Sequence, residues 1–381
     1  MEDIPREKGS PYHKPLLEKQ TGNHVREYLF PLSEEERKEL EAIIDELPPK
    51  VIDLHTHIGP KESVKRQLSP TTYGEIFPSQ RLGSLSLHKI LLEGRLIKQG
   101  FYKKVYSIVF GFPFSPSTID YSEVDQYLRK FLRASLNFIP FLIPQGGEKG
   151  VKETKEALES KFYWGIGEAH PELVNPPAEH LRGEQGFLAE DILKIAQEQK
   201  LPLIIHLPKH LLNHLEEIKE LSDDYPGIKI VLAHVGHVYV LTERSKKALD
   251  QVLSLPNVYF DTSTVTEKEV FKYVLEKSGS GKLLFATDAP FDALRIKAKF
   301  IEGKMRLFSS QGLPGTERAE EEISRMLISS PKALLEAIKE VYPKEKQARL
   351  AKENIFFGNA LEILPRKLPS LEEKFEHGNN R

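Results

Sequence analysis

Short apolar runs alternate with longer amphipathic stretches along the chain from Val51 onward. Each short run is rich in β-branched or other apolar residues, and its near-continuous apolar character fits a strand that is covered on both faces. The pattern predicts eight strands, at residues 51–57, 105–111, 138–143, 162–168, 202–206, 229–234, 258–262 and 283–288. The intervening stretches predict helices, at residues 122–136, 151–160, 186–199, 211–224, 242–255 and 266–278.

Strands that alternate with helices imply a parallel sheet, and eight such units predict a closed (β/α)8 TIM barrel, which is an α/β fold. An open doubly wound sheet is the alternative. No glycine-rich phosphate loop follows the first predicted strand, which weakens a nucleotide-binding version of that fold. Long connections follow strands one and eight, at 59–104 and 291–352. We expect helices within them at 85–99 and 316–326, and a closing helix at 353–364.

An N-terminal extension precedes the barrel. Ser33 and Glu36 have the spacing of a capping box, which predicts a helix from there to about residue 47, and Pro48-Pro49 would stop it. The expected organisation is an N-terminal arm and helix at 1–49, the barrel at 50–365 and a charged tail at 366–381.

Composition narrows the classes of function. The chain has 381 residues, a net charge of −2 and no cysteine. Disulfides and thiolate ligands are therefore excluded, and nothing in the charge favours nucleic acid or an anionic membrane. No apolar run approaches the roughly 20 residues of a membrane helix, and the polar N-terminus does not resemble a secretory signal. We expect a cytoplasmic protein with a small-molecule substrate, and the sequence leaves a homodimer open.

The first predicted strand ends in two histidines one residue apart, His55 and His57. Side chains at i and i+2 of a strand point to the same side. The two imidazoles can therefore aim at one point, and imidazole is a common ligand of zinc and similar ions.

Four further strands end in residues that can bind a metal. These are Glu168, His206, His234 and Asp288, at the ends of the fourth, fifth, sixth and eighth predicted strands. Each alone could be a rim residue or a turn cap. A barrel, however, places all strand ends on one face, and ionisable groups that converge there without a partner would be costly. The pattern therefore predicts a metal site.

The ordered motifs resemble the amidohydrolase superfamily of metal-dependent barrel enzymes, and in particular its amidohydrolase-related and TatD-like groups. The resemblance covers about residues 50–365 and rests on Asp-x-His-x-His, Gly-x-Gly-Glu, three strand-end positions and the segment 354–360. These are found at Asp53–His57, Gly165–Glu168, His206, His234-Val235-Gly236, Thr287-Asp288-Ala289-Pro290 and Asn354–Ala360.

The resemblance implies roles for these residues. His55 and His57 would hold one ion with Asp288, and His206 and His234 would hold a second, with Glu168 between the two. In the amidohydrolase-related group one metal often suffices, and the histidine at the position of His234 is catalytic. The sequence therefore leaves open whether one or two ions are bound. Zinc is the expected ion, with manganese or iron as alternatives. Asp288 would take a proton from the attacking water and pass it to the leaving group.

Other polar residues lie just beyond the strand ends and are candidates for substrate contacts or for simple rim positions. They are His170, Lys209, His210, His237, Arg244 and Arg295. Asp53 either orients a ligand or fills a polar layer of the barrel. The aromatic residues Tyr73, Phe77, Phe112 and Phe114 either line the pocket or pack elsewhere.

The favoured function is a hydrolase that acts on an amide, a lactone or ester, or a phosphoester. The alternative is a metal-dependent decarboxylase of the amidohydrolase-related group, which one metal and an arginine that clamps the substrate would favour. A TatD-like nuclease is disfavoured because the sequence has no basic stripe. A non-catalytic scaffold is disfavoured because an inactive site usually loses a metal-binding residue, and none of the motif's metal-binding residues is missing here.

Overall fold

The computed structural model describes residues 33–59, 63, 104–113, 117–132, 138–174, 177–183, 186–289, 291–302, 304–310 and 316–366. The predicted arm at 1–32, the predicted helix at 85–99 and the tail from residue 367 lie outside the described residues, as do Tyr73, Phe77 and Phe114. The limits of the three predicted domains stay a prediction.

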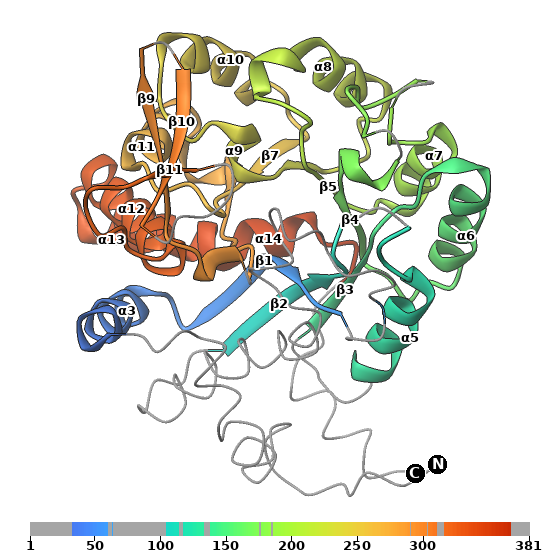
Figure 1. The fold of residues 1–381 in the computed structure, drawn as a ribbon, viewed down its shortest axis with the longest axis horizontal. Coiled ribbons are helices and arrows are strands. Elements are labelled where there is room, and N and C mark those ends of the chain that lie inside the picture. The colour runs from blue at the N-terminus through green and yellow to red at the C-terminus, as the bar shows by residue number, and fades with distance from the viewer. Residues whose placement is uncertain are drawn as a thin grey trace, which may run out of the picture.

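Eight parallel strands form one sheet in which each strand pairs with its successor along the chain (Figure 1). The strands are β1 (Lys50–His57), β2 (Lys104–Phe110), β3 (Phe138–Leu142), β4 (Gly165–Ala169), β5 (Leu203–Ile205), β6 (Ile230–Leu232), β7 (Val258–Asp261) and β8 (Leu283–Leu284). The sheet closes on itself because Leu54 N donates to Phe285 O and Asp288 N donates to His55 O, both at 2.9 Å. The predicted (β/α)8 barrel is therefore confirmed.

Helices surround the strands, as Figure 1 shows. The α-helices of the barrel are α5 (Tyr121–Leu132), α6 (Gly147–Glu159), α7 (Glu190–Gln199), α8 (Leu215–Asp224), α9 (His234–His237), α10 (Glu243–Leu253), α11 (Lys268–Ser278), α12 (Met326–Val341), α13 (Glu345–Glu353) and α14 (Asn359–Ile363). A π-turn, η7 (Asn354–Gly358), joins the last two. Short 3-10 turns are η3 (Pro171–Leu173), η4 (Leu211–Asn213), η5 (Gly279–Lys282) and η6 (Phe291–Ala293).

The barrel strands are buried on both faces, as their apolar composition predicts. All three residues of β5 and all three of β6 are buried. The helices cover the outer face with one apolar stripe each, for example Ile218 and Leu221 of α8. The polar residues at the strand ends are thereby held on a rigid frame.

The predicted N-terminal helix is confirmed as α3 (Glu34–Glu46). The Ser33 hydroxyl accepts from Glu36 N at 3.1 Å, and the Glu36 carboxylate accepts from Ser33 N at 2.9 Å, which completes the capping box. Its apolar residues Leu40, Ile43 and Ile44 are buried. The helix packs against α12.

The connection after β8 differs from the prediction. Residues 316–326 do not form a helix. Instead β9 (Ile296–Ile301), β10 (Lys304–Ser309) and β11 (Glu317–Arg318) form a small separate sheet. The stretch 316–325 is rich in charge and has no apolar stripe to bury, whereas the apolar sequence that follows forms α12.

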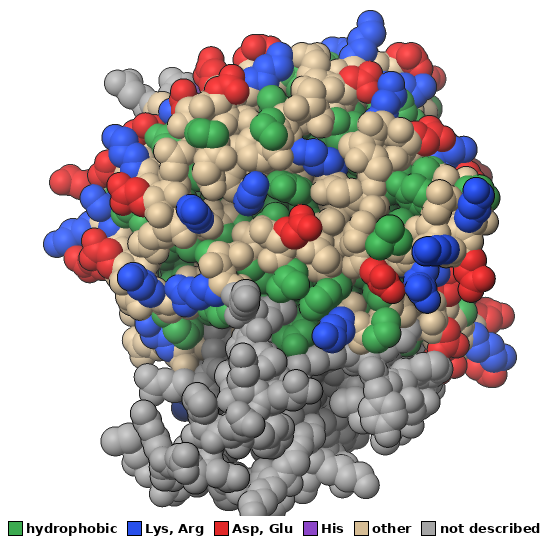
Figure 2. Space-filling model, turned by 180° about the vertical axis from the view of Figure 1, so that it is seen from behind, with side chains coloured by type: hydrophobic (Ala, Val, Ile, Leu, Met, Phe, Trp, Pro, Cys, Tyr) green, Lys and Arg blue, Asp and Glu red, His purple; other side chains and the backbone are tan. Residues whose placement is uncertain are grey.

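Smaller differences concern element ends. The predicted helix at 211–224 is divided into η4 and α8, and the strands β4 to β8 are shorter than their apolar runs. Among the described helices, none is both long and apolar enough to cross a bilayer. Lysines and arginines alternate with acidic residues over the coloured part of the face in Figure 2, which shows no broad field of one sign.

Candidate metal centre

The carboxyl ends of the strands bring the predicted ligands together around one small pocket. It has a volume of about 80 Å³ and is lined by His57, Pro113, Glu168, His170, Glu172, His206, His234, Asp288 and Phe291. His55 does not line the pocket and is fully buried, with its ring centroid 5.0 Å from that of His57 and 5.4 Å from that of His234. The strand-end residues chosen from the sequence are thus neighbours in space.

Three atoms form a compact triangle at the end of β1. His55 Nε2 lies 3.2 Å from His57 Nε2, and Asp288 Oδ1 lies 3.4 Å from the first and 3.2 Å from the second. Tetrahedral ligands with zinc–nitrogen bonds of roughly 2.0–2.1 Å are about 3.3–3.4 Å apart. The triangle therefore has the dimensions of one face of a tetrahedral zinc site.

Hydrogen bonds at the opposite ring nitrogens define the tautomers. His57 Nδ1 lies 2.9 Å from the carbonyl oxygen of Gly111, which can only accept, so this nitrogen carries the proton. His55 Nδ1 likewise lies 2.9 Å from the carboxylate of Asp261. In the neutral rings both Nε2 atoms then carry lone pairs, and two lone pairs cannot bond to each other.

Asp288 Oδ1 is the third atom of the triangle. It is buried and has no hydrogen-bond partner among the described residues, although both Nε2 atoms lie within 3.4 Å. With both rings neutral and protonated at Nδ1, three electron-pair donors would face one another without a donor hydrogen between them. A divalent cation fits this donor set. Without a cation, such a group of buried polar atoms would be unfavourable, because it is neither hydrogen-bonded nor replaced by apolar side chains.

A second group can hold an ion beside the first. Its members, His206, His234 and His237, offer ligand atoms within 4.8 Å of one another. His237 Nε2 is buried and has no hydrogen-bond partner among the described residues. The sequence suggested His237 only as a substrate contact, whereas the structure places it among potential ligands.

Glu168 lies between the two groups. Its carboxylate approaches His206 Nδ1 to 2.8 Å, His55 and His57 Nε2 to 3.7 Å each, and His234 Nε2 to 3.9 Å. Gly165 and Gly167 precede it in β4 because side chains there would collide with Phe141 and Ile204. The glycines of the Gly-x-Gly-Glu motif therefore let β4 pack closely against its neighbours.

The backbone around His234 is strained. His234, Val235, Gly236 and His237 all have φ between 51° and 64°, which forms a left-handed turn. Such a conformation is unfavourable for a β-branched residue such as Val235. The turn is held because Asp261 Oδ1 accepts from His234 N at 2.8 Å. Strain of this kind is commonly retained at functional sites.

Burial and charge oppose each other in the pocket. Burial favours the neutral imidazole and lowers the pKa of His170, His234 and His237. Burial would also lower the pKa of His55, but the carboxylates of Glu168, Asp288 and Asp261 outweigh it and raise that pKa to about 10. The surrounding carboxylates thus stabilise positive charge at the position of the triangle.

Burial alone would raise the pKa of Glu168. The neighbouring His206, His55 and His57 outweigh this effect and hold that pKa well below its usual range. Glu168 is therefore an anion in the centre of the histidine cluster.

Asp261 is a site residue that the sequence reasoning missed. It is fully buried at the end of β7 and accepts from His55 Nδ1, from His234 N and from the hydroxyl of Ser263. The signal was present, since Asp261 ends an apolar run as Glu168 and Asp288 do. Glu172 was also missed, because it follows no strand directly and lies in the 3-10 turn η3.

Asp53 has the role of a structural anchor. Its carboxylate accepts from His55 N at 3.2 Å, from Thr287 N at 3.0 Å and from the Thr287 hydroxyl at 2.6 Å. It thereby ties β1 to the segment that carries Asp288. This geometry favours the first of the two interpretations of Asp53, orientation of ligands.

Two predicted substrate contacts are engaged elsewhere. Arg295 Nη2 forms an ion pair with Glu36 at 2.6 Å, and Lys209 pairs with Glu179 at 3.4 Å. Neither cation lines the pocket. The prediction for Arg295 did not foresee that α3 supplies a buried carboxylate to it. His170 and His237 do lie at the site, with ring centroids 4.1 Å and 4.4 Å from that of His206.

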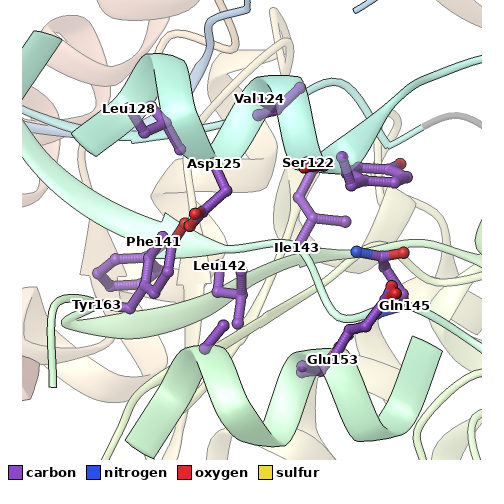
Figure 3. Close-up of a pocket in the computed structure, with 14 residues that line it drawn as sticks. Ser122, Val124, Asp125, Leu128, Phe141, Leu142, Ile143, Gln145, Glu153 and Tyr163 are labelled. Carbon is purple, nitrogen blue, oxygen red and sulfur yellow. Dashed lines mark hydrogen bonds between the residues drawn. The ribbon is translucent and has the colours of Figure 1, made fainter. Parts of the chain in front are cut away.

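A larger cavity, of about 250 Å³, lies outside the barrel between α5, β3 and α6 (Figure 3). Asp125 and Tyr163 point toward each other in this view and form a hydrogen bond. None of the histidines described above lines this cavity. Gly111 lines this cavity, and its carbonyl oxygen accepts from His57.

Known protein structures share this fold. A candidate amidohydrolase from Staphylococcus aureus is 14% identical, with 83% of this chain and 100% of that chain covered and a TM-score of 0.51. IDCase from Metarhizium anisopliae, in its apo form, is 14% identical, with 84% and 97% covered and the same TM-score of 0.51. A 2,6-dihydroxybenzoate decarboxylase from Rhizobium is 12% identical, with 82% and 98% covered and a TM-score of 0.48.

At such identities the first two structures indicate a common fold and nothing about substrate. No curated protein matches the chain by sequence. The sequence model that describes the family named Amidohydrolase matches residues 118–336, more than half of the chain. The chain therefore belongs to the amidohydrolase family.

Proposed function

We propose that this chain is a metal-dependent hydrolase of small molecules that carry an amide, a lactone or ester, or a phosphoester bond. One observation carries the proposal. His55 Nε2, His57 Nε2 and Asp288 Oδ1 lie 3.2–3.4 Å from one another, and Asp288 Oδ1 is buried with no hydrogen-bond partner among the described residues. That arrangement suits a divalent cation at the mouth of a barrel, where enzymes of this architecture bind substrate.

We assign one ion to His55, His57 and Asp288, and a second to His206 and His234, with Glu168 between them. His237 is a further candidate ligand of the second ion. Nitrogen and oxygen donors fit zinc best in this geometry, and manganese or iron remain alternatives. When bound, such ions acidify a water molecule and polarise a carbonyl or phosphoryl oxygen.

The side chains of the protein supply the remaining steps. Asp288 is positioned to accept the proton of the attacking water and to deliver it to the leaving group. His234 Nδ1 lies 2.9 Å from the hydroxyl of Ser263, which itself donates to Asp261 at 2.6 Å. This relay orients the His234 ring, so that its Nε2 is available to a ligand. Glu168 supplies fixed negative charge.

Metal analysis tests the proposal. The full-length chain is loaded with zinc, freed of excess ion and analysed for metal per chain, beside Glu168→Ala and the exposed control Glu179→Ala. We expect two ions in the wild type and the control, and one or none in Glu168→Ala. Hydrolysis of lactones, amides and phosphoesters should then vanish with a chelator and return with zinc. Absence of bound metal under every loading condition would contradict the proposal.

Decarboxylation is the second candidate. The triangle of His55, His57 and Asp288 is complete without the second group, so a single ion would leave His234 free as an acid or base. One ion per chain, unchanged in Glu168→Ala, together with release of carbon dioxide from a carboxylic acid substrate, would favour this function over hydrolysis.

A further inference from the structure

Glu172 is an acidic residue of the pocket that the proposed chemistry does not use. It lines the pocket beside His170 and His206 but belongs to neither group of potential ligands. Its backbone nitrogen donates to His170 Nδ1 at 3.1 Å, which anchors the turn η3 at the pocket wall. The position of the residue is therefore defined by the same turn that holds His170.

The carboxylate of Glu172 is not neutralised by a cation among the described residues. Within the part of the chain that the structure describes, no lysine or arginine lines the pocket. Lys209 and Arg295, the two cations suggested by the sequence, pair with Glu179 and Glu36. Two other carboxylates, Glu168 and Asp288, face the proposed ions, so Glu172 remains to act on the substrate.

The electrostatic consequence follows from its half-buried position. Burial raises the pKa of Glu172, His206 lowers it and the nearby anion Glu168 raises it further, and above this raised pKa the side chain is an anion. An anion in a partly desolvated pocket repels a second anion and attracts an ammonium or N–H donor more strongly than it would in water. A substrate that carries a free carboxylate would meet this repulsion, and one that carries an amine would gain from it.

We infer that Glu172 is a specificity-determining residue that selects substrates with an amino or other cationic group near the scissile bond and disfavours those with a carboxylate. This inference rests on the proposed metal-dependent function. It deepens that function because it distinguishes a hydrolase of amine-bearing substrates from a decarboxylase, whose substrate must carry a carboxylate.

Hydroxamates that bind a metal ion test the inference without a known substrate. Three probes of similar length differ only in the tail: β-alanine hydroxamate has an ammonium, propionohydroxamate is neutral and succinic monohydroxamate has a carboxylate. Their dissociation constants are measured by calorimetry on the zinc-loaded full-length chain. The variants are Glu172→Gln and the control Glu179→Gln, an exposed acid that does not line the pocket.

We expect the wild type and the control to bind the ammonium probe about tenfold more tightly than the neutral probe, and the carboxylate probe about tenfold more weakly. In Glu172→Gln the three constants should agree within about threefold, with an unchanged affinity for the neutral probe. Equal constants in the wild type, or an unchanged spread in Glu172→Gln, would overturn the inference alone. If the neutral probe does not bind the zinc-loaded chain, or binds equally well without zinc, the metal-dependent function is overturned. This inference then falls with it.

Discussion

Asp261 Oδ2 lies 2.9 Å from His55 Nδ1, and both side chains are fully buried, on β7 and β1 respectively. The other oxygen of Asp261 accepts from His234 N and from the Ser263 hydroxyl. One carboxylate therefore orients the first group of potential ligands and the second at the same time. A carboxylate that orients a metal-binding histidine usually affects metal affinity or activity strongly, although it does not itself bind the ion.

Asp261→Asn should weaken metal binding without removing a ligand. An amide offers one accepting oxygen where the carboxylate serves four donors, so His55 and His234 lose their fixed orientation. We expect zinc affinity to fall about 10- to 100-fold, measured by competition with a chromophoric chelator. The exposed Asp250→Asn should leave the affinity unchanged. Equal affinities for Asp261→Asn and wild type, with both folded, would contradict the orienting role.

Two glycines close to the site should differ in their tolerance of alanine. A Cβ at Gly165 would lie within 2.7 Å of three ring atoms of Phe141, which is fully buried, whereas a Cβ at Gly111 would meet one methyl of Val124 at 2.9 Å. Val124 borders the cavity of Figure 3 and can give way. We expect Gly165→Ala to lower the free energy of unfolding by about 3 kcal/mol and Gly111→Ala by about 1 kcal/mol or less. Urea denaturation measures both, and the reverse order would refute the steric argument.

Glu36 should be important for stability although it lies in the N-terminal extension. Its Oε1 pairs with Arg295 at 2.6 Å and with Arg325 at 3.2 Å, and all three side chains are largely buried. Glu36→Gln leaves two guanidinium groups without this counter-charge, so we expect a loss of about 3 kcal/mol in the free energy of unfolding.

The control is Glu35→Gln, an exposed change on the same helix, which should cost less than about 0.5 kcal/mol. If Arg295 contacted substrate as its sequence position suggested, Arg295→Met would raise KM at unchanged stability. The structure leads us to expect lower stability at an unchanged KM.

Glu217 should make a contribution to stability that depends on pH. It accepts from Leu181 N at 2.6 Å and lies 3.1 Å from His214 Nδ1. Burial would raise the pKa of its carboxyl group, but these two partners and His180 outweigh burial and lower it. A lowered pKa in the folded state means that the contribution is complete above the ordinary value near 4.5 and is lost as pH falls through the folded-state pKa.

We therefore expect Glu217→Gln to be less stable than wild type by about 1 kcal/mol at pH 7, the typical net contribution of one hydrogen bond. The difference should shrink below pH 4.5. Denaturation of the metal-free proteins at pH 7 and pH 4 measures it. A difference that is constant with pH would mean that the charge of Glu217 is not the cause.

Local patterns predicted much of the architecture. Each strand of the barrel falls within or beside a short apolar run, because a strand covered on both faces needs apolar residues at consecutive positions. The capping box of Ser33 and Glu36 correctly predicted the start of α3. The prediction of a helix at 316–326 was wrong, because helix propensity without an apolar stripe provides no packing energy to hold the segment on the barrel.

The sequence alone was sufficient to identify the eight-fold alternation and the strand-end residues His55, His57, Glu168, His206, His234 and Asp288, because strand period and burial are local properties that leave a local pattern. Only the tertiary structure showed that Asp261 joins His55 to His234 and that α3 reaches Arg295 through Glu36. It also showed that, among the described residues, no lysine or arginine lines the pocket beside Glu172. Glu36 and Arg295 are 259 positions apart. Closure of the barrel determines which distant side chains meet. Closure depends on the packing of all the strands and helices together, so these contacts cannot be predicted from any short stretch of sequence.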